Sequence, residues 1–208
     1  MSFLRRPMQW VMAVVLAGAT AACATAPVAP PLQPTALPNG VTPQQMVASI
    51  RAAAAGSAAE LDVQPLRDSQ VEDLRQEAAA LEVRGLYPEA AEVLQQALAV
   101  TPDDPAVMQE LAEVAVLQWQ FDQAAQLARR AHAAGSGVGP LCRRHWATVE
   151  QVAQARLALA SVAPAARPRA DAATQAEATA LAAQQARADA AAAKQAREAC
   201  TVSAPPRF

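Results

Sequence analysis

Apolar residues recur at helical spacing through the middle of the chain. In the segment from 86 to 100, for example, Ala90, Leu94 and Ala97 fall on one face of a helix, and polar residues take the other face. A strand with one buried face would instead alternate apolar and polar residues at every second position. The pattern therefore predicts an all-α protein in which each helix buries one apolar stripe.

Capping residues mark where these helices begin. Thr42 precedes Pro43 and is followed by Gln45, which predicts an N-terminal helix opened by a capping box. Ser69 and Glu72 have the spacing of a second capping box and predict another helix start. Further starts are predicted where a proline opens a helical pattern, at Pro88, Pro105 and Pro140.

The helical pattern repeats after 34 residues. The matched pairs are Gly85 and Trp119, Tyr87 and Phe121, Ala90 and Ala124, Leu94 and Ala128, and Ala97 and Ala131. Small residues at these positions let two helices approach closely, and the aromatic residue fills the space beside them. This period and pattern resemble the tetratricopeptide repeat (TPR), a helix–turn–helix unit.

The resemblance implies a short TPR-like helical-hairpin solenoid. The first copy covers residues 71–104, the second covers 105–138, and a helix over 139–160 begins a partial third. Trp119 stands in the second copy where the first has the turn glycine, and Ser136 stands where the pattern has its terminal proline. An array of about two and a half repeats is near the minimum for stability, so self-association or a partner would stabilise it.

In tetratricopeptide proteins, the first helix of each repeat lines a concave groove that binds a peptide or a partner protein. Carried over to this chain, the resemblance implies a partner-binding groove made of Glu72, Arg75, Ala79, Glu82, Val83, Gln109, Glu113, Val116, Leu117, Arg143, Ala147, Glu150 and Gln151. The surface is mixed in charge. It therefore differs from the basic clamp that holds a C-terminal carboxylate in chaperone-binding relatives.

The N-terminus has the features of an export signal. A charged start with Arg5 and Arg6 precedes the apolar run 8–20, and two alanines then precede Cys23. The segment resembles a bacterial lipoprotein signal, which implies lipidation of Cys23. Thr20 departs from that pattern, so cleavage by an ordinary signal peptidase remains an alternative, as does a retained membrane helix, although the run is short for one.

Prolines then crowd the segment after Cys23, which suits an extended spacer between a lipid and a domain. Ala24 follows the cysteine, which by resemblance to known lipoprotein sorting implies the periplasmic face of the outer membrane. A soluble periplasmic protein is the alternative. The expected organisation is a signal peptide at 1–22, a linker at 23–41, a helix and loop at 42–70, the repeat region at 71–160, a linker at 161–170, an Ala-rich C-terminal helix at 171–200 and a tail at 201–208.

The Ala-rich helix contains a single large aliphatic residue, Leu181, and no heptad seam is expected in it. Cys142 and Cys200 can form a disulfide in an oxidising periplasm. If the two helices are straight and antiparallel, however, Cys200 overshoots Cys142 by about 11 residues, or roughly 16 Å. A bridge and two unpaired thiols both remain open.

Charge divides the chain into two halves. The segment 60–122 holds 14 acidic and 3 basic residues, whereas 123–208 holds 11 basic and 5 acidic residues. Arg129, Arg130, Arg143 and Arg144 form a basic patch with His132 and His145. Attraction to anionic lipid or to the acidic half are the two expectations for it, and four arginines without interleaved aromatics are a weak signal for nucleic acid.

The sequence does not favour an enzyme. It holds 2 histidines, no Gly-rich phosphate loop and no metal-spaced cluster; Cys142 and His145 lie one helical turn apart without further ligands. No metal, cofactor or nucleic-acid partner is expected. The predicted function is that of a non-catalytic scaffold or adaptor that binds another protein or peptide in the cell envelope. The alternative is a structural envelope protein in which the Ala-rich helix is the working element.

Overall fold

A computed structural model describes residues 34–55, 68–162 and 172–201. The predicted signal peptide 1–22 and the lipidation site Cys23 lie outside the described residues, as does most of the predicted linker 161–170 and tail 201–208. The described residues, all from Pro34 onward, belong to one compact unit.

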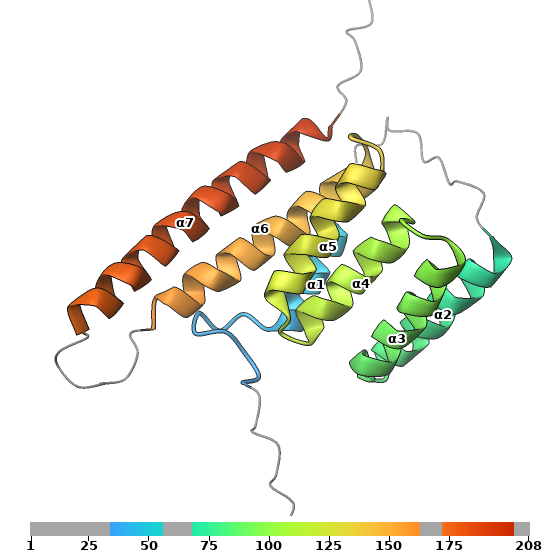
Figure 1. Ribbon diagram of the computed structural model, residues 1–208, viewed down its shortest axis with the longest axis horizontal. Helices are drawn as coiled ribbons and strands as arrows, with labels where there is room; N and C mark the ends of the chain where they lie inside the picture. Colours follow the sequence, from blue (N-terminus) through green and yellow to red (C-terminus); the bar gives the residue numbers. More distant parts are fainter. Residues whose placement is uncertain (1–33, 56–67, 163–171, 202–208) are drawn as a thin grey trace, which may run out of the picture. The chain divides into compact units, whose positions relative to one another are not determined.

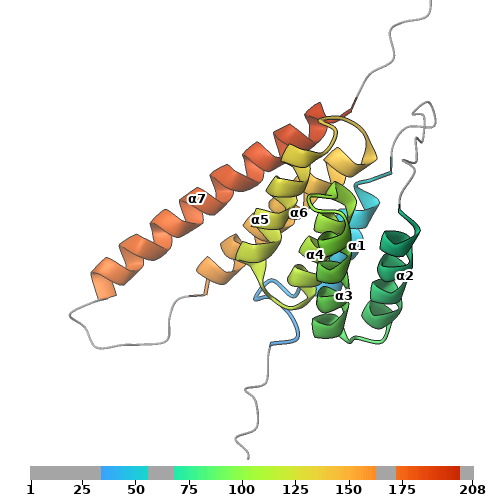
Figure 2. The ribbon, with the colours of Figure 1, turned by 45° about the vertical axis from the view of Figure 1, so that its right-hand side comes forward.

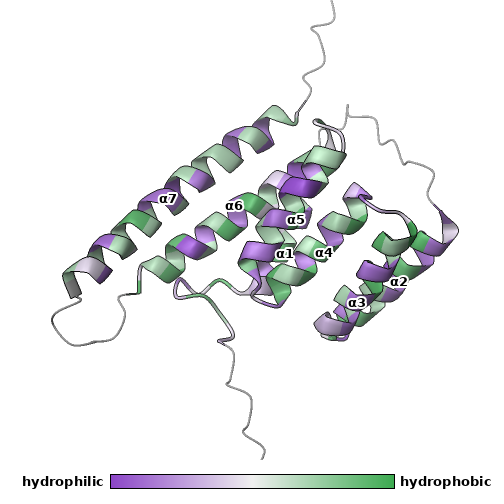
Figure 3. Cartoon of the chain, in the orientation of Figure 1, coloured by the Kyte–Doolittle hydropathy of each residue, from purple (hydrophilic) through white to green (hydrophobic). Residues whose placement is uncertain are grey.

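Within these ranges the chain forms seven helices and no strand, which confirms the all-α prediction (Figure 1). They are α1 (Pro43–Ala52), α2 (Ser69–Val83), α3 (Tyr87–Val100), α4 (Pro105–Leu117), α5 (Phe121–Ala134), α6 (Pro140–Ala160) and α7 (Ala172–Ala199). Hydrophilic and hydrophobic stretches alternate along α2 to α7 in Figure 3, as amphipathic helices require. None of the helices in the described ranges is both long and apolar enough to cross a membrane.

Most of the predicted helix starts are confirmed. The Thr42 side chain accepts a hydrogen bond from the Gln45 amide at 3.2 Å, and the Gln45 side chain accepts one from the Thr42 amide at 2.9 Å, which completes the capping box of α1. The capping box predicted at Ser69 is wrong. Asp68 caps α2 instead and accepts from the Gln70 amide at 2.8 Å. A carboxylate there also interacts favourably with the positive end of the helix dipole.

The two predicted repeats are helical hairpins, α2 with α3 and α4 with α5. Their turns match at the backbone, because Gly85 has a φ of 76° and Trp119, 34 residues later, has a φ of 63°. The small residues predicted to allow close helix packing are fully buried: Ala90, Ala97, Ala124, Ala128 and Ala131 are each 0% exposed. The sequence pattern and the helix packing therefore agree in both copies.

Helix α7 packs along α6, and a disulfide joins Cys142 to Cys200 with the two Cα atoms 5.7 Å apart (Figures 1 and 2). The predicted overshoot assumed that the two helices begin level with each other. In the structure, α7 starts beyond the end of α6, and this offset brings Cys200 back to Cys142.

The expectation that the Ala-rich helix lacks a heptad seam is wrong. Shielded positions on α7 recur at spacings of three and four residues, at Ala183, Ala186, Ala190, Ala193, Arg197 and Cys200. The seam is built mainly from alanines, so a search for large aliphatic residues does not find it. Small side chains let α6 and α7 approach closely along their shared length.

Helix α1 does not pair with its chain neighbour as a hairpin, but lies across α4 and α6 (Figure 1). Its residues Met46, Val47 and Ile50 are buried in one cluster with residues of α4, α5 and α6. Leu37 is also buried there, at 4% exposed. Two residues of the predicted spacer, Leu37 and the partly buried Val41, therefore pack into the core, while residues 38–40 between them are exposed.

Candidate protein-binding site

The positions implied by the first repeat copy surround a pocket. Glu72, Arg75, Ala79, Glu82 and Val83 all line a cavity of about 320 Å³. The remaining lining residues are Arg51, Gln76, Ala78, Leu94, Glu110, Val114 and Arg144. The pocket thus lies where the end of α1, the inner face of α2, and parts of α4 and α6 meet.

The lining of this pocket combines an apolar base with ion pairs. Leu94, Val114 and Ala78 are buried, whereas Val83 is 89% exposed. Arg75 donates to Glu110 from its Nε at 2.9 Å and binds Glu72 at 2.7 Å. The hydrogen bonding to Glu110 is the main cause that raises the pKa of Arg75, and Glu72 adds to it. The opposite charges are paired with each other, so the pocket has no net preference for an anion or a cation.

Arg51 connects α1 to two other helices. Its Nη2 donates to Glu82 of α2 at 2.8 Å, and its Nε donates to Glu113 of α4 at 2.8 Å. Burial acts to lower the pKa of Arg51, but the bonds and charges of Glu82 and Glu113 outweigh it and raise that pKa. The guanidinium stays charged and joins α1 to the edge of the pocket.

The prediction of an open groove is wrong in the second copy and in the partial third. Six of the implied groove residues are buried, none more than 6% exposed: Gln109, Glu113, Val116, Leu117, Arg143 and Ala147. Val116, Leu117 and Ala147 share a buried cluster with Met46, Val47 and Ile50 of α1. Helix α1 therefore occupies the part of the concave surface where a partner was expected.

Glu113 is the centre of a buried polar network. Both of its carboxylate oxygens accept hydrogen bonds from Arg144, and it also receives the Gln109 amide at 2.8 Å. Gln109 donates further to Thr148 at 2.8 Å, and its amide oxygen lies 2.8 Å from Nδ1 of His145. The guanidiniums of Arg51 and Arg144 and the amide of Gln109 thus neutralise and hydrogen-bond the Glu113 carboxylate, which is 0% exposed.

His145 is held neutral by its surroundings. Burial lowers its pKa to about 3, and repulsion from His132 and Arg144 adds to that effect. Because the Gln109 oxygen accepts a hydrogen bond, Nδ1 of His145 carries the proton. Its other nitrogen, Nε2, is buried without a hydrogen-bond partner among the described residues.

The basic patch predicted from the sequence is divided among several contacts. Arg143 donates to the carbonyl oxygens of Ala53 and Ala54 at 3.2 and 2.9 Å, and Arg144 binds Glu113. Arg130 pairs with Asp103 at 3.2 Å on the surface. Of the two expectations for this patch, attraction to the acidic half holds for Arg130 and Arg144, because their partners Asp103 and Glu113 lie in the acidic segment 60–122.

Glu150 and Cys142 also have structural partners. Glu150, implied as a groove residue, accepts a hydrogen bond from Arg197 of α7 at 2.9 Å and so faces the α6–α7 contact. The expected groove is wrong at this position too. Cys142 is bonded to Cys200, so it offers no free thiolate beside His145. In the described ranges no three His, Cys, Asp or Glu side chains are grouped as metal ligands would be.

The sequence did not predict that α1 contacts the inward polar residues of α4, as Arg51 does with Glu113. A signal was present, because Gln109 and Glu113 stand four residues apart, on one face of a largely apolar helix. Polar residues on a buried helix face need partners. The partner Arg51 is too distant in the sequence for periodicity to identify it.

A family model described as the tetratricopeptide repeat matches residues 71–114, which cover most of α2, all of α3 and most of α4. Searches of curated proteins and of solved structures found no match. The first repeat is therefore similar to a tetratricopeptide repeat in sequence, and it folds as a helical hairpin. Such repeats generally mediate binding to other proteins.

Proposed function

We propose that this protein is an exported lipoprotein, anchored through Cys23 at the periplasmic face of the outer membrane, that binds a partner protein without catalysing a reaction. The observation that carries the proposal is the pocket beside α2, in the segment that matches the tetratricopeptide repeat. A lipid anchor would confine this pocket to the membrane and raise the effective concentration of a bound partner there.

The pocket has the chemistry of a site for a peptide segment. Its base of Ala78, Leu94 and Val114 accepts an apolar side chain, and the surrounding carboxylates and guanidiniums offer hydrogen bonds to a polar backbone. The alternative, in which the Ala-rich helix works as an independent structural element, is less well supported. Much of α7 is committed to α6 through its seam and the disulfide.

Photo-crosslinking in intact cells tests the binding site. Gln76 is exposed on α2 and lines the pocket, so a photoreactive residue placed there should yield a discrete adduct with one partner protein. Gln96 is exposed on α3 outside the pocket and is the matched control. No adduct from Gln76, or the same adducts from both positions, would contradict the proposal.

The anchor is tested separately by mass spectrometry of the mature N-terminus. We expect a diacylglyceryl-modified Cys23 at the new terminus and loss of membrane association in Cys23→Ser. A mature chain with a free amine on Ala24, or with an unmodified Cys23, would refute lipid anchoring while leaving the protein-binding site in place.

A further inference from the structure

We propose that the surface beneath α1 is an exchangeable helix-binding site, and that a partner's amphipathic helix with the chemistry of α1 displaces α1 from it. The inference deepens the proposed function and rests on it. It adds a second part to the binding surface and specifies what that part recognises.

The first component of this site is an apolar slot. Met46, Val47 and Ile50 of α1 are 1%, 3% and 0% exposed, and they pack with Val116 of α4 and Ala147 of α6. Their spacing is i, i+1 and i+4, which is one face of a helix. The slot therefore selects a helix that presents aliphatic side chains in this order.

The second component is a pair of carboxylates. Arg51 follows the last aliphatic residue directly and binds both Glu82 and Glu113. Glu113 is 0% exposed whereas the Arg51 side chain is 44% exposed, so the carboxylate is desolvated and needs a charged donor that reaches it from the surface. A helix that binds at this site therefore also needs an arginine directly after its last aliphatic residue.

The third component recognises the end of a helix. Arg143 is 6% exposed, and its Nε and Nη2 donate to the carbonyl oxygens of Ala53 and Ala54, at the C-terminal end of α1. The last carbonyls of a helix have no partners within it, and a cation there also favours the helix dipole. Slot, carboxylates and Arg143 together fit a short helix that ends at this point.

The rest of the fold does not require α1 for its helix pairing. Each of α2, α4 and α6 packs against its own following helix, α3, α5 and α7 respectively. Helix α1 has 10 residues, which is shorter than the ~12–15 residues that an isolated helix needs to be even marginally stable in water. Its helical state therefore depends on the site it occupies, and we expect α1 to lose its helical structure when it leaves that site.

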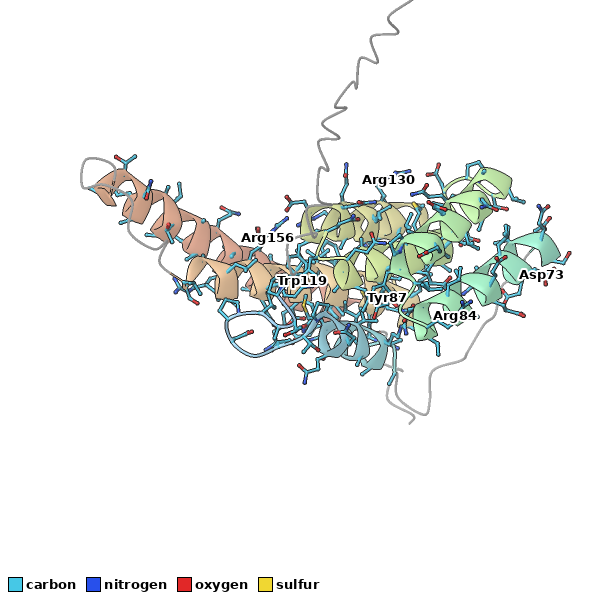
Figure 4. The ribbon with its side chains drawn as sticks, turned by 90° about the horizontal axis from the view of Figure 1, so that it is seen from below. Asp73, Arg84, Tyr87, Trp119, Arg130 and Arg156 are labelled. Carbon is cyan, nitrogen blue, oxygen red and sulfur yellow. A yellow bond between two sulfur atoms is a disulfide. The ribbon has the colours of Figure 1, made fainter. Side chains whose placement is uncertain are left out.

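The site of α1 is also continuous with the open pocket. Arg51 and Glu82 belong to both. Tyr87 and Trp119, which Figure 4 labels, pack against the buried cluster that contains the α1 side chains, and Tyr87 also receives a hydrogen bond from Gln44 of α1 at 3.3 Å. A partner that enters the pocket beside α2 therefore reaches the end of α1 directly. One partner chain with a peptide segment and a helix would fill both parts.

The test uses the full-length chain and a fluorescent peptide with the sequence of residues 42–55. In the native chain, α1 competes as a tethered ligand at an effective concentration on the order of millimolar. Ile50→Asp places a charge in the slot and releases α1. We expect the Ile50→Asp chain to bind the peptide at least about tenfold more tightly than the native chain, because the competitor is gone.

Three controls make the result specific. Ala48→Asp places the same charge on the exposed face of α1 and should leave peptide binding at the native level. A peptide carrying Ile50→Asp or Arg51→Ala should not bind the released site. Circular dichroism should show that the Ile50→Asp chain keeps its helices apart from about one short helix. If it does not fold, Arg51→Ala serves as the milder variant with the same expected direction.

Two outcomes would overturn the inference. One is a folded Ile50→Asp or Arg51→Ala chain that binds the peptide no more tightly than the native chain. The other is peptide affinity that rises through dimers exchanging α1, since the site would then serve a second copy of this chain. Either result leaves the Gln76 adduct unaffected, so failure here is distinguishable from failure of the proposed function.

Discussion

Trp119 occupies a left-handed backbone position, with a φ of 63°, where the first repeat has Gly85. A side chain at such a position costs about 1 kcal/mol or more, because its Cβ approaches the following carbonyl. The Trp119 side chain packs against the buried cluster that includes α1 and lies 5.6 Å from the Phe121 ring, measured between centroids. Packing therefore offsets strain at this turn, whereas glycine avoids the strain at the first turn.

Gly85→Ala tests the backbone argument directly. The φ of 76° disfavours alanine, but a Cβ at this position would meet nothing within 4 Å, so the penalty is conformational only. We expect the free energy of unfolding to fall by about 1 kcal/mol, measured by urea denaturation. Gly137→Ala is the control, because its surroundings are equally open and its φ is not positive. Equal effects of the two substitutions would refute the argument.

His145 predicts a pH dependence of stability. Its pKa falls from 6.5 to about 3 on folding. Below pH 6.5, the His145 side chain is therefore protonated in the unfolded chain but not in the folded chain. Above pH 6.5, His145 is neutral in both states and does not change the free energy of unfolding. As the pH falls from 6.5 toward 3, proton binding by the unfolded chain lowers the free energy of unfolding. Between pH 7.5 and 5.5, we expect His145 to reduce the free energy of unfolding by about 1.4 kcal/mol.

Urea denaturation of His145→Gln at both pH values measures that contribution. The variant should lose most of the difference between pH 7.5 and 5.5, whatever its absolute stability. His132→Gln retains His145 and should keep the difference. A His145→Gln protein with an unchanged pH dependence would show that another group is responsible.

At the scale of elements, the pairing of α6 with α7 shows that alanine suffices for a helix seam. The disulfide between Cys142 and Cys200 fixes one end of that pair. Close packing of small side chains and a covalent bond together hold a helix that has a single large aliphatic residue, Leu181, and that residue is 67% exposed. The bond is therefore expected to matter for stability.

Removing the bridge with Cys142→Ser and Cys200→Ser should destabilise the protein. The crosslink closes a loop with a sequence separation of 58, for which the chain-entropy account gives about 4 kcal/mol. Chemical denaturation with and without dithiothreitol measures the effect. The native chain should lose stability in reductant and the double variant should not. A native chain that is indifferent to reductant would contradict a stabilising disulfide.

Local signals in the sequence predicted the helices better than their mutual arrangement. Thr42, Asp104 and the first-turn prolines act within a few residues of themselves, so they predicted where α1, α3, α4 and α6 begin. The 34-residue spacing predicted the two hairpins. The position of α1 against α4 and α6 depends on contacts between residues far apart in the chain, such as Arg51 with Glu113. Periodicity contains no information about such pairs.

At the scale of the whole molecule, the concave surface of the repeats is divided in two. Helix α1 covers the part formed by α4 and α6, while the pocket beside α2 remains open. Five groove residues implied by the sequence, all in the first copy, line this pocket. Six of the others are buried and Glu150 binds Arg197 of α7, because the resemblance describes a bare repeat array and includes neither a preceding helix that packs into it nor a following helix such as α7.

The central claim is that the pocket beside α2 holds a partner protein, and two neighbouring alanines test it most directly. Ala79 lines the pocket and Ala80 does not, yet both are exposed on α2. Arginine at either position should therefore be tolerated by the fold. The measurement is the yield of the partner adduct formed from a photoreactive residue at position 76. We expect Ala79→Arg to abolish that adduct and Ala80→Arg to preserve it, and an adduct that persists in Ala79→Arg would contradict the account.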